Sequence, residues 1–307
     1  MYHFIVNLRS RAGRAEKVWK MVKAELDERE IEYKSYVTKH PGHATKLADM
    51  ICNEYDGIKN IIMVGADGTV NEIINGIHPY SDVILGVIPV GKRNDLARGL
   101  GVPADPVEAL LRIIEPKRYQ YVDHGILNFY DGSTPRRFAV SAGVGLDADV
   151  CYSASHSALK MALNRIGFDK LVYIVLGVKQ IFKYKPVDIE ILVDGIKKRR
   201  VSNMIFAAAM IQKTEGNGHR MAPKADNADG KLTVCLVHGL SRFKTAILWP
   251  LLLLGKHTLI KGVETFDCTT LEITSTDKLV VHTDGEVAGK DTHFRFACLP
   301  ERVRMFV

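Results

Sequence analysis

The sequence predicts an α/β protein with two domains, a doubly wound α/β domain over residues 1–123 and an antiparallel β domain over residues 124–296. Two observations predict this division. Up to about residue 123, strand patterns alternate regularly with helical patterns, which is typical of a mostly parallel sheet covered by helices. After that point, short strand patterns follow one another with turns between them. The length of 307 residues also exceeds the ~250 to 300 residues at which single cores stop growing.

The elements of the first domain follow from the spacing of apolar residues. We expect strands at residues 4–6, 33–37, 60–63 and 83–88, and helices at 16–30, 44–55, 95–100 and 106–114. Ligands in such sheets bind at the carboxyl ends of the strands. The loops after the strands are therefore the first place to look for a site.

The elements of the second domain are mostly strands. We expect them at residues 137–141, 187–193, 204–209, 231–237, 270–274 and 293–296. Apolar residues at helical spacing interrupt this pattern twice, around residues 158–183 and around residues 243–259. The second domain is therefore expected to carry two helical insertions.

Composition excludes several classes of protein. Charged residues at 25% and hydrophobic residues at 47% describe a globular chain rather than a disordered one. Five scattered cysteines, none in a Cys-x-x-Cys pair, predict reduced thiols in the cytoplasm and argue against a disulfide frame or a zinc site. A strand pattern starts at the N-terminus, so we expect no signal peptide. The longest apolar run, residues 246–254, is too short for the ~20 residues of a spanning helix.

The net charge does not identify the kind of partner that the protein binds. A net charge of +7 is compatible with nucleic acid, an anionic membrane surface or phosphorylated substrates as partners. Composition alone does not choose among these three.

A glycine-containing loop stands at the centre of the first domain. The apolar run at residues 60–64 ends at Gly65-Ala66-Asp67-Gly68-Thr69, and an Ile-Ile-x-x-Ile pattern at helical spacing follows. Glycines let the backbone approach a ligand, and the N-terminus of a helix attracts an anion. The loop is either a phosphate cradle or an ordinary turn between a strand and a helix, and this stretch alone leaves both open.

A second glycine loop follows the next strand. Residues 86–92 fit the first seven positions of a P-loop, but Arg93 occupies the eighth position, where a hydroxyl should bind magnesium. As an ordinary turn, the loop would use Asn94 or Asp95 to cap the next helix. Capping is expected whether or not the loop binds a ligand.

Two pairs of carboxylates lie in turns of the second domain. Asp226 and Asp229 are three residues apart in a loop, and oxygen ligands of this kind suit a hard cation. Asp284 and Glu286 flank a glycine and could supply a base and an orienting group. Each pair has an alternative reading, because polar turns and Asp-Gly hairpins need no function.

Taken together and in this order, the motifs resemble those of the diacylglycerol kinase catalytic family, which includes bacterial soluble lipid kinases, sphingosine kinases and ceramide kinases. The motifs are Gly-Ala-Asp-Gly-Thr-Val-Asn-Glu at residues 65–72, Gly-x-x-Asn-Asp-x-Ala-Arg at 91–98, Gly-x-Gly with Pro-x-Ala and Asp-Gly-x-Leu within 216–232, and Asp-Gly-Glu at 284–286. The resemblance covers nearly the whole chain. It implies a nucleotide-binding N-terminal domain, a C-terminal β-sandwich, and a chain end, about 297–307, that returns to the first domain.

The resemblance also implies an activity. It implies a cytoplasmic enzyme of phospholipid biosynthesis that uses ATP and Mg²⁺ to phosphorylate the hydroxyl of diacylglycerol or a related lipid. Its partner would be a lipid at a membrane surface, reached by peripheral contact without a transmembrane segment and without nucleic acid; a homodimer stays open. Phosphoryl transfer needs mainly positioning, charge neutralisation and one base, which glycine loops and acidic loops can supply.

Carried over by position, the resemblance gives each motif a role. The ATP site would be lined by Asn7, Arg9, Ser10, Arg11, Thr38, Gly65, Ala66, Asp67, Gly68, Thr69, Asn71 and Lys92, with Asp67 in the key acidic place. A structural magnesium would be held by Asp226, Asp229 and the Lys231 carbonyl, with Asp95 linked to it through water. Asp284 and Glu286 would take the proton of the acceptor hydroxyl, and the resemblance leaves open which of the two is the base.

The chain departs from the family pattern in its glycine loops. Ala66 stands where a second glycine is usual, residues 7–11 lack the usual proline and glycine, and Lys92-Arg93 replace a small hydroxyl residue near the nucleotide. The two long cations would either contact phosphates or block the site. Two alternatives stay open for this reason: a nucleotide- or lipid-binding member with little catalysis, and an NAD kinase, which shares the Gly-x-Asp-Gly-Thr loop.

Two stretches could touch a membrane surface. Residues 197–200 are a run of four cations, and residues 168–184 mix apolar side chains with lysines. A basic amphipathic segment can lie in the interface of an anionic membrane. A solvated charge run and a core-packing helix are the simpler readings of these two stretches.

Overall fold

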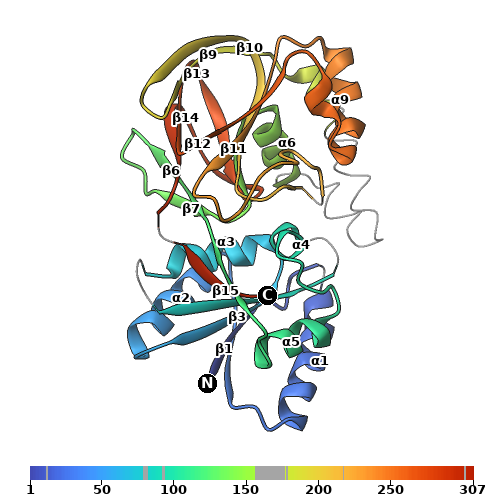
Figure 1. Cartoon of the computed structure of the whole chain (residues 1–307), viewed down its shortest axis with the longest axis vertical. Helices are drawn as coiled ribbons and strands as arrows, with labels where there is room; N and C mark the ends of the chain where they lie inside the picture. Colours follow the sequence, from blue (N-terminus) through green and yellow to red (C-terminus); the bar gives the residue numbers. More distant parts are fainter. Residues whose placement is uncertain are drawn as a thin grey trace. The chain divides into compact units, whose positions relative to one another are not determined.

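The structure, a computed structural model, describes residues 1–11, 13–78, 82–91, 94–155, 177, 179–216, 218–300 and 302–307. These residues form two compact units, one made of Met1–His124 with Pro300–Val307 and the other of Gly125–Leu299. Figure 1 shows the elements of each unit. Lys92, Arg93 and most of the helical insertion predicted over residues 158–183, including its suggested membrane-facing part, lie outside the described residues.

The first unit is built on a six-stranded sheet. Its strands are β1 (Tyr2–Val6), β2 (Tyr33–Val37), β3 (Lys59–Gly65), β4 (Val83–Pro89), β5 (Tyr119–Val122) and β15 (Val303–Phe306), in the order β2-β1-β3-β4-β15-β5. Neighbouring strands pair in parallel except β15 and β5, which pair antiparallel. The last strand of the chain therefore lies between β4 and β5, and Arg302 Nε bonds Asp123 Oδ1 at 2.7 Å beside it.

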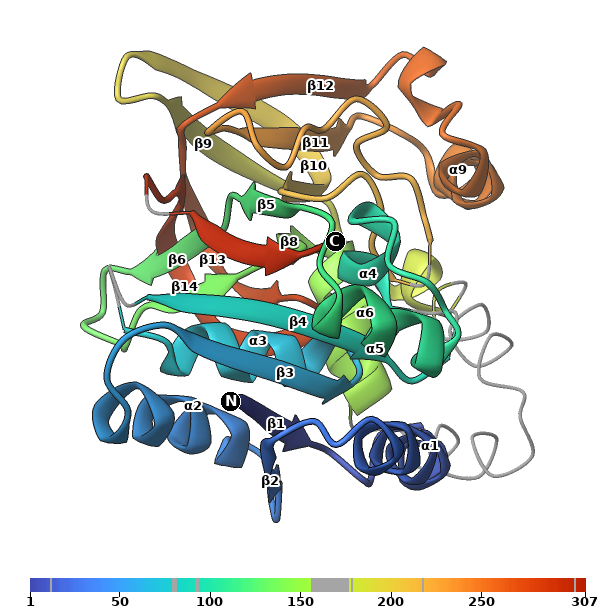
Figure 2. The same ribbon diagram turned by 60° about the horizontal axis from the view of Figure 1, so that its bottom comes forward.

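Helices cover both faces of this sheet (Figures 1 and 2). They are α1 (Arg14–Glu28), α2 (His43–Glu54), α3 (Asp67–Gly76), α4 (Asp95–Gly99) and α5 (Pro106–Ile114). Alternate side chains of the strands, such as Phe4 and Val6, share a buried cluster with α1 and α5. Helices α2 and α3 pack so closely that Gly76 has no room for a side chain beside the Thr45 carbonyl. The predicted doubly wound α/β domain is confirmed.

The second unit is built from antiparallel strands. They are β6 (Gly125–Phe129), β7 (Arg136–Phe138), β8 (Ser141–Gly145), β9 (Val187–Val193), β10 (Lys197–Met210), β11 (Leu232–His238), β12 (Val263–Cys268), β13 (Thr270–Thr283) and β14 (Glu286–Cys298). Their order is β12-β11-β10-β8-β13-β14-β6-β7, and β9 pairs with both β10 and β13. Side chains from most of these strands, among them Val234 and Phe294, share one buried core. The predicted antiparallel β-sandwich is confirmed.

One predicted strand of this unit is wrong in its extent. The sequence predicts a single strand at residues 137–141, but the structure has β7 and β8 with a break at Ala139 and Val140. The backbone N–H groups of these two residues donate to the carboxylate of Asp284 instead of to a neighbouring strand. A side chain thus replaces the sheet pairing at the break.

The second unit also contains helices, which connect some of its strands. Among the elements with full bounds they are α6 (Leu146–Ser155), which the sequence did not predict, and α9 (Arg242–Leu254) with the short 3-10 helix η1 (His257–Leu259), which confirm the helical insertion predicted around residues 243–259. Residues 179–183, at the end of the other predicted insertion, are also helical. Among the described residues, no helix has the length and apolar character needed to cross a membrane.

Candidate functional site

The loops after the parallel strands of the first unit meet at one edge of its sheet. The first residues after β1, β2, β3 and β4 are Asn7, Thr38, Ala66 and Val90. The strand ends lie level, because Val6 pairs with Val64 and Gly65 pairs with Pro89. The structure therefore brings the predicted ATP-site residues 7–11, 38 and 65–71 to the edge where sheets of this kind bind ligands.

Gly65 and Thr69 shape the loop after β3. A Cβ at Gly65 would lie 2.8 Å from Thr69 Oγ1, so a larger residue would force the loop to shift. The same Oγ1 accepts a hydrogen bond from Asn7 Nδ2 at 3.1 Å, which ties the end of β1 to the first turn of α3. Thr69 and Asn71 are buried, so the accessible part of the loop is residues 66–68.

The Asp67 carboxylate is held by the backbone of the next loop. Its Oδ1 accepts the N–H of Asp95 at 3.1 Å and the N–H of Leu96 at 3.4 Å. Asn94 caps the same short helix, α4, by accepting the Ala97 N–H at 2.6 Å, so Asn94 is the capping residue of the two that the sequence suggested. The acidic residue predicted to serve ATP thus joins the loops after β3 and β4.

The segment after β1 folds into a tight turn. The carbonyl of Asn7 accepts the N–H of Ser10 at 3.0 Å, and Arg11 adopts a left-handed backbone with φ 54°. Ser10 is buried, whereas Arg9 is exposed. Arg9 is therefore the most accessible cation of this segment. Lys92, the other cation assigned to the ATP site, stays a prediction.

In the second unit, Asp284 and Glu286 belong to a two-residue hairpin turn. Thr283 pairs with Glu286, and Asp284 and Gly285 have φ values of 50° and 81°, as a type I′ turn requires. The Asp284 carboxylate accepts three backbone N–H groups, those of residues 139–141, at 2.8 to 3.0 Å. Glu286 is exposed and pairs with Arg136 at 2.9 Å. The two predicted catalytic carboxylates therefore have different surroundings.

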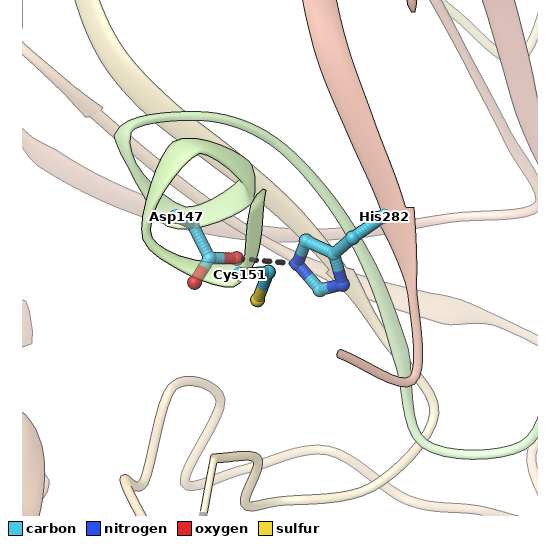
Figure 3. Close-up of side chains that lie close together, drawn as sticks. All are labelled: Asp147, Cys151 and His282. Atoms are coloured by element: carbon cyan, nitrogen blue, oxygen red, sulfur yellow. Dashed lines mark hydrogen bonds and ion pairs between the residues drawn. The ribbon is translucent and has the colours of Figure 1, made fainter. Parts of the chain in front are cut away.

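A buried polar network lies next to this turn (Figure 3). His282, which is fully buried, places its Nε2 2.7 Å from Asp147 Oδ2. Glu215 Oε1 lies 3.9 Å from the same nitrogen. On the other side of the ring, Nδ1 accepts the N–H of Gly285 at 3.2 Å. The imidazole therefore connects the partly buried carboxylate of Asp147 to the backbone of the Asp284–Gly285 turn.

Burial and charge set the protonation of the network. Burial acts to raise the pKa of Asp147, but the charge and the hydrogen bond of His282, together with smaller contributions from neighbouring groups, outweigh burial and the pKa is lowered. Burial and the charge of Asp147 raise the pKa of Glu215 to about 8. Burial acts to lower the pKa of His282, but the neighbouring carboxylates raise it to about 9. The Gly285 N–H opposes the second proton, because a doubly protonated ring has no lone pair at Nδ1.

The same cluster has the composition of a metal site. Ligand atoms of Asp147, Cys151 and His282 lie within 4.8 Å of one another. In the neutral ring, the Gly285 bond leaves the proton on Nε2, and the charged ring carries a proton there as well. Since Nε2 donates to Asp147 in both states, it has no lone pair for a metal, and we interpret the cluster as a hydrogen-bond network.

The acidic loop predicted to hold magnesium precedes β11. Asp226 Oδ1 accepts the Ala228 N–H, and Asp229 Oδ1 accepts the Lys231 N–H, both at 3.0 Å. Both aspartates are exposed. Their Oδ2 atoms have no hydrogen bond to the part of the chain that the structure describes. Asp95 belongs to the first unit, where its carboxylate pairs with Arg98, so its water-mediated link to this loop stays a prediction.

Comparison with known families decides the assignment. The family model "Diacylglycerol kinase catalytic domain" matches residues 1–124, and the model "YegS C-terminal NAD kinase beta sandwich-like domain" matches residues 139–307, more than half of the chain. The chain belongs to the diacylglycerol kinase family. It is 30% identical to "Putative lipid kinase YtlR" of Bacillus subtilis, over 99% of this chain and 98% of that protein. It is 26% identical to "Diacylglycerol kinase" of Bacillus subtilis, over 84% of this chain and 80% of that protein.

Solved structures show that this kinase-family fold is shared. The crystal structure of "a putative diacylglycerol kinase" from Bacillus anthracis superposes with a TM-score of 0.78 at 22% identity, covering 99% of this chain and 94% of that one. An NAD kinase from Archaeoglobus fulgidus in complex with ATP superposes less well, with a TM-score of 0.55 at 14% identity over 100% of this chain and 94% of that one. Membership of a kinase family makes the chain a phosphotransferase of the kinase type.

Sequence reasoning missed the residues around the turn of Asp284 and Glu286, which we call the acidic hairpin. Asp147, Glu215 and Arg136 carry no motif of their own, and each lies far along the chain from the residue it contacts. The available signal was His282, an ionisable residue in a largely apolar strand, two positions before Asp284. A buried histidine needs a hydrogen-bond partner, but the sequence does not show which residue that partner is.

Proposed function

We propose that this chain is a lipid kinase that transfers the γ-phosphate of ATP to the hydroxyl of diacylglycerol or a related lipid, with Mg²⁺. The observation that carries the proposal is the gathering of the Asn7, Gly65–Thr69 and Asn94–Asp95 loops at the carboxyl edge of the parallel sheet. The names of the relatives, lipid kinase and diacylglycerol kinase, support a lipid as the acceptor.

The nucleotide would bind at the loop after β3. The accessible backbone at residues 66–68 lies at the N-terminus of α3, where first-turn N–H groups have no acceptor inside the helix and the dipole favours a phosphate. Arg9 is exposed on the turn after β1, and the hydrogen bond from Asn7 to Thr69 joins this turn to the loop after β3. Asp67 would keep the loops after β3 and β4 in register, because its carboxylate bonds the backbone of both Asp95 and Leu96.

The residues predicted for magnesium fit such an ion. The carboxylates of Asp226 and Asp229 and the Lys231 carbonyl are hard oxygen donors. Both carboxylates are exposed, and each has one oxygen without a hydrogen bond to the described residues. Bound there, the ion would supply charge for ordering the acidic loop. The turns that Asp226 and Asp229 make with their own backbone keep the two carboxylates on one short loop.

The acidic hairpin would handle the proton of the acceptor hydroxyl. Three N–H donors stabilise the charged form of the Asp284 carboxylate, which makes it a weak proton acceptor and a good fixed negative charge. Glu286 is exposed and pairs with Arg136 at 2.9 Å. We therefore assign the base to Glu286 and orientation of the hairpin to Asp284.

A phosphate-transfer assay tests the proposal. The purified protein is incubated with ATP labelled at the γ-phosphate, Mg²⁺ and mixed micelles that contain diacylglycerol, sphingosine or ceramide. We expect labelled phospholipid from one of these lipids. Absence of transfer to all of them, together with an ATP-induced rise in melting temperature, would instead identify a binding protein with little catalysis. Transfer to NAD in a parallel sample would identify an NAD kinase.

A further inference from the structure

Helix α9 carries apolar side chains on two opposite faces. Leu248 and Leu252 on its inner face are buried in a cluster with β10 and β11. Phe243, Ile247 and Leu254, which recur at intervals of four and seven residues, lie on the opposite face and are 75%, 47% and 61% exposed. One face of the helix is therefore buried in the core, and the opposite face exposes large apolar side chains to solvent.

The exposed apolar side chains continue beyond the helix. Leu253 and Leu259, the latter in η1, are 49% and 84% exposed. We call the exposed side chains of Phe243, Ile247, Leu253, Leu254 and Leu259 the α9 surface. In Figure 1, α9 lies at the margin of the second unit. Exposed apolar residues on a soluble protein are normally scattered, and a group within one short segment marks an interaction site.

The charges around this surface have one sign. The segment from residue 242 to residue 262 contains Arg242, Lys244, Lys256 and Lys261 and no aspartate or glutamate. All four cations are exposed, and none of them forms an ion pair with the described residues. Arg242 and Lys244 stand on either side of Phe243 around the helix. The apolar stripe is thus bordered by cations whose counter-ions are not supplied by the described parts of the protein.

The cationic run at residues 197–200 differs from this surface. The structure places it at the start of β10, where Lys198 pairs with Glu190 at 2.7 Å and Arg199 pairs with Glu264 at 2.6 Å. Its neighbour Ile196 is exposed but is a single apolar side chain. Two of its four cations are neutralised by the fold itself, so it suits an anionic surface less well than the α9 surface does.

Helix α9 and η1 also contact the segment just before the acidic loop predicted for magnesium. The Leu252 carbonyl accepts the Arg220 N–H at 2.9 Å, and His257 Nε2 lies 3.0 Å from the Met221 carbonyl. Met221 is buried in the same cluster as Leu252. The segment that leads to Asp226 is therefore packed on the inner side of α9 and η1.

We propose that the α9 surface docks this chain on an anionic lipid membrane, with the apolar stripe in the interface and the four cations on the headgroups. The proposal rests on the proposed function, because a kinase of membrane lipids has to reach its acceptor at a bilayer. A basic, apolar helix face of this kind binds by apolar burial together with attraction to anionic lipids. A second copy of the chain fits less well, since its own cations would meet the four cations of the first.

Vesicle co-sedimentation tests the proposal. Full-length protein is spun with vesicles of phosphatidylcholine and with vesicles that contain phosphatidylglycerol, at low and high salt. We expect binding to the anionic vesicles that weakens as salt rises. Phe243→Ser combined with Leu254→Ser should weaken binding by roughly tenfold or more, because each apolar side chain that leaves the interface loses its burial. Ile58→Ser, an equally exposed site in the first unit, is the matched control and should bind like the wild type.

A second variant separates charge from apolar contact. Lys244→Glu combined with Lys256→Glu should abolish most of the salt-sensitive part of the binding. Equal binding of the wild type and both double variants would overturn the proposal, as would absence of binding to anionic vesicles. A wild-type dimer that Phe243→Ser converts to a monomer, with vesicle binding unchanged, would show instead that a second copy covers the surface.

Kinase assays distinguish failure of docking from failure of the proposed function. The wild type is assayed on a short-chain diacylglycerol in solution and on the same headgroup in vesicles. In the Phe243→Ser/Leu254→Ser variant, the ratio of turnover on vesicles to turnover in solution should fall. If the wild type phosphorylates neither form yet binds anionic vesicles, the kinase proposal fails and the docking proposal stands.

Discussion

Asp67 and Asp284 are two carboxylates that the sequence assigns to chemistry and that the structure joins to backbone amides of another segment. Asp67 accepts N–H groups from Asp95 and Leu96, in the next loop of the same sheet. Asp284 accepts three N–H groups from residues 139–141, which lie more than a hundred residues earlier in the chain. Both hold two segments together, but only the partners of Asp67 are close in sequence.

The two regions differ in what surrounds the carboxylate. The loop of Asp67 is supported by short polar side chains, namely those of Asn7 and Thr69, at the end of a parallel sheet. The hairpin of Asp284 rests on a buried network of ionisable groups, since Gly285 bonds His282 and His282 bonds Asp147. The stability of the hairpin should therefore depend on pH through this network.

The largest expected effect concerns the assigned base. Glu286→Gln should lower kinase turnover by roughly a hundredfold or more, because a positioned general base contributes about 10²- to 10⁴-fold. The melting temperature should change little, since an exposed ion pair such as the one with Arg136 contributes about 0 to 1 kcal/mol. Steady-state turnover and thermal unfolding of the same preparations measure both. Glu190→Gln, which breaks the exposed pair with Lys198, is the control, and a variant Glu286→Gln with full turnover would remove Glu286 from the role of base.

The next effect is on the pH dependence of stability. The fold raises the pKa of His282 from 6.5 to about 9, so its contribution is complete below about pH 6.5 and is lost as pH rises through about 9. Glu215, with its pKa raised to about 8, changes stability in the same direction. His282→Gln should therefore lower the free energy of unfolding by up to about 3 kcal/mol near pH 6, and by less near pH 9.

Urea unfolding of the wild type and His282→Gln at pH 6 and pH 9 measures this difference. A difference between the two proteins that grows with pH would show that the network does not hold a charged imidazole. His293→Gln is the control, because the pair of His293 on β14 with Glu272 on β13 is partly exposed.

A smaller effect on stability is expected when Asp284 or Asp67 is replaced by asparagine, and its size should differ between the two sites. In the wild type, both oxygens of the Asp284 carboxylate accept backbone N–H groups. In Asp284→Asn, the new amide nitrogen must therefore face an N–H donor, and the free energy of unfolding should fall by about 1 to 3 kcal/mol. In Asp67→Asn, the amide oxygen in the place of Oδ1 can still accept both N–H groups, and only the 3.2 Å contact of Oδ2 with the Asp95 N–H is lost, so the loss of free energy of unfolding should lie at the low end of that range. Asp105→Asn is the control, because asparagine caps a helix about as well as aspartate. Urea unfolding ranks the three, and an equal cost at both sites would contradict the comparison.

The smallest effect is at the residue that departs from the family pattern. Ala66 has an extended backbone with φ −112°, so Ala66→Gly should change the free energy of unfolding by less than about 1 kcal/mol. Gly65→Ala should cost about 1 to 3 kcal/mol, because its Cβ would press on Thr69 Oγ1. Thermal unfolding of both variants is the measurement. If Ala66→Gly were the more damaging change, the account of this loop would be wrong.

The helices and parallel strands of the first unit could be predicted because their signals are local. The apolar run before Gly65 and the helical spacing after Asn71 depend on residues a few positions apart, and the same holds for the Asp-Gly turn of the acidic hairpin. The choice of Asn94 over Asp95 as the helix cap could not be read in this way. Both residues are good caps, and the structure uses the backbone of Asp95 to bind Asp67.

The sequence by itself determined the two-domain pattern of elements and the order of the motifs, because hydrophobic periodicity and turn chemistry act over short distances. Only the tertiary structure decided the break at Ala139 and Val140, the buried contact of His282 with Asp147, and the exposure of one face of α9. Each of these features depends on which segment, distant in the sequence, packs against the side chain or bonds it. Burial and hydrogen-bond partners of that kind leave no local pattern in the chain.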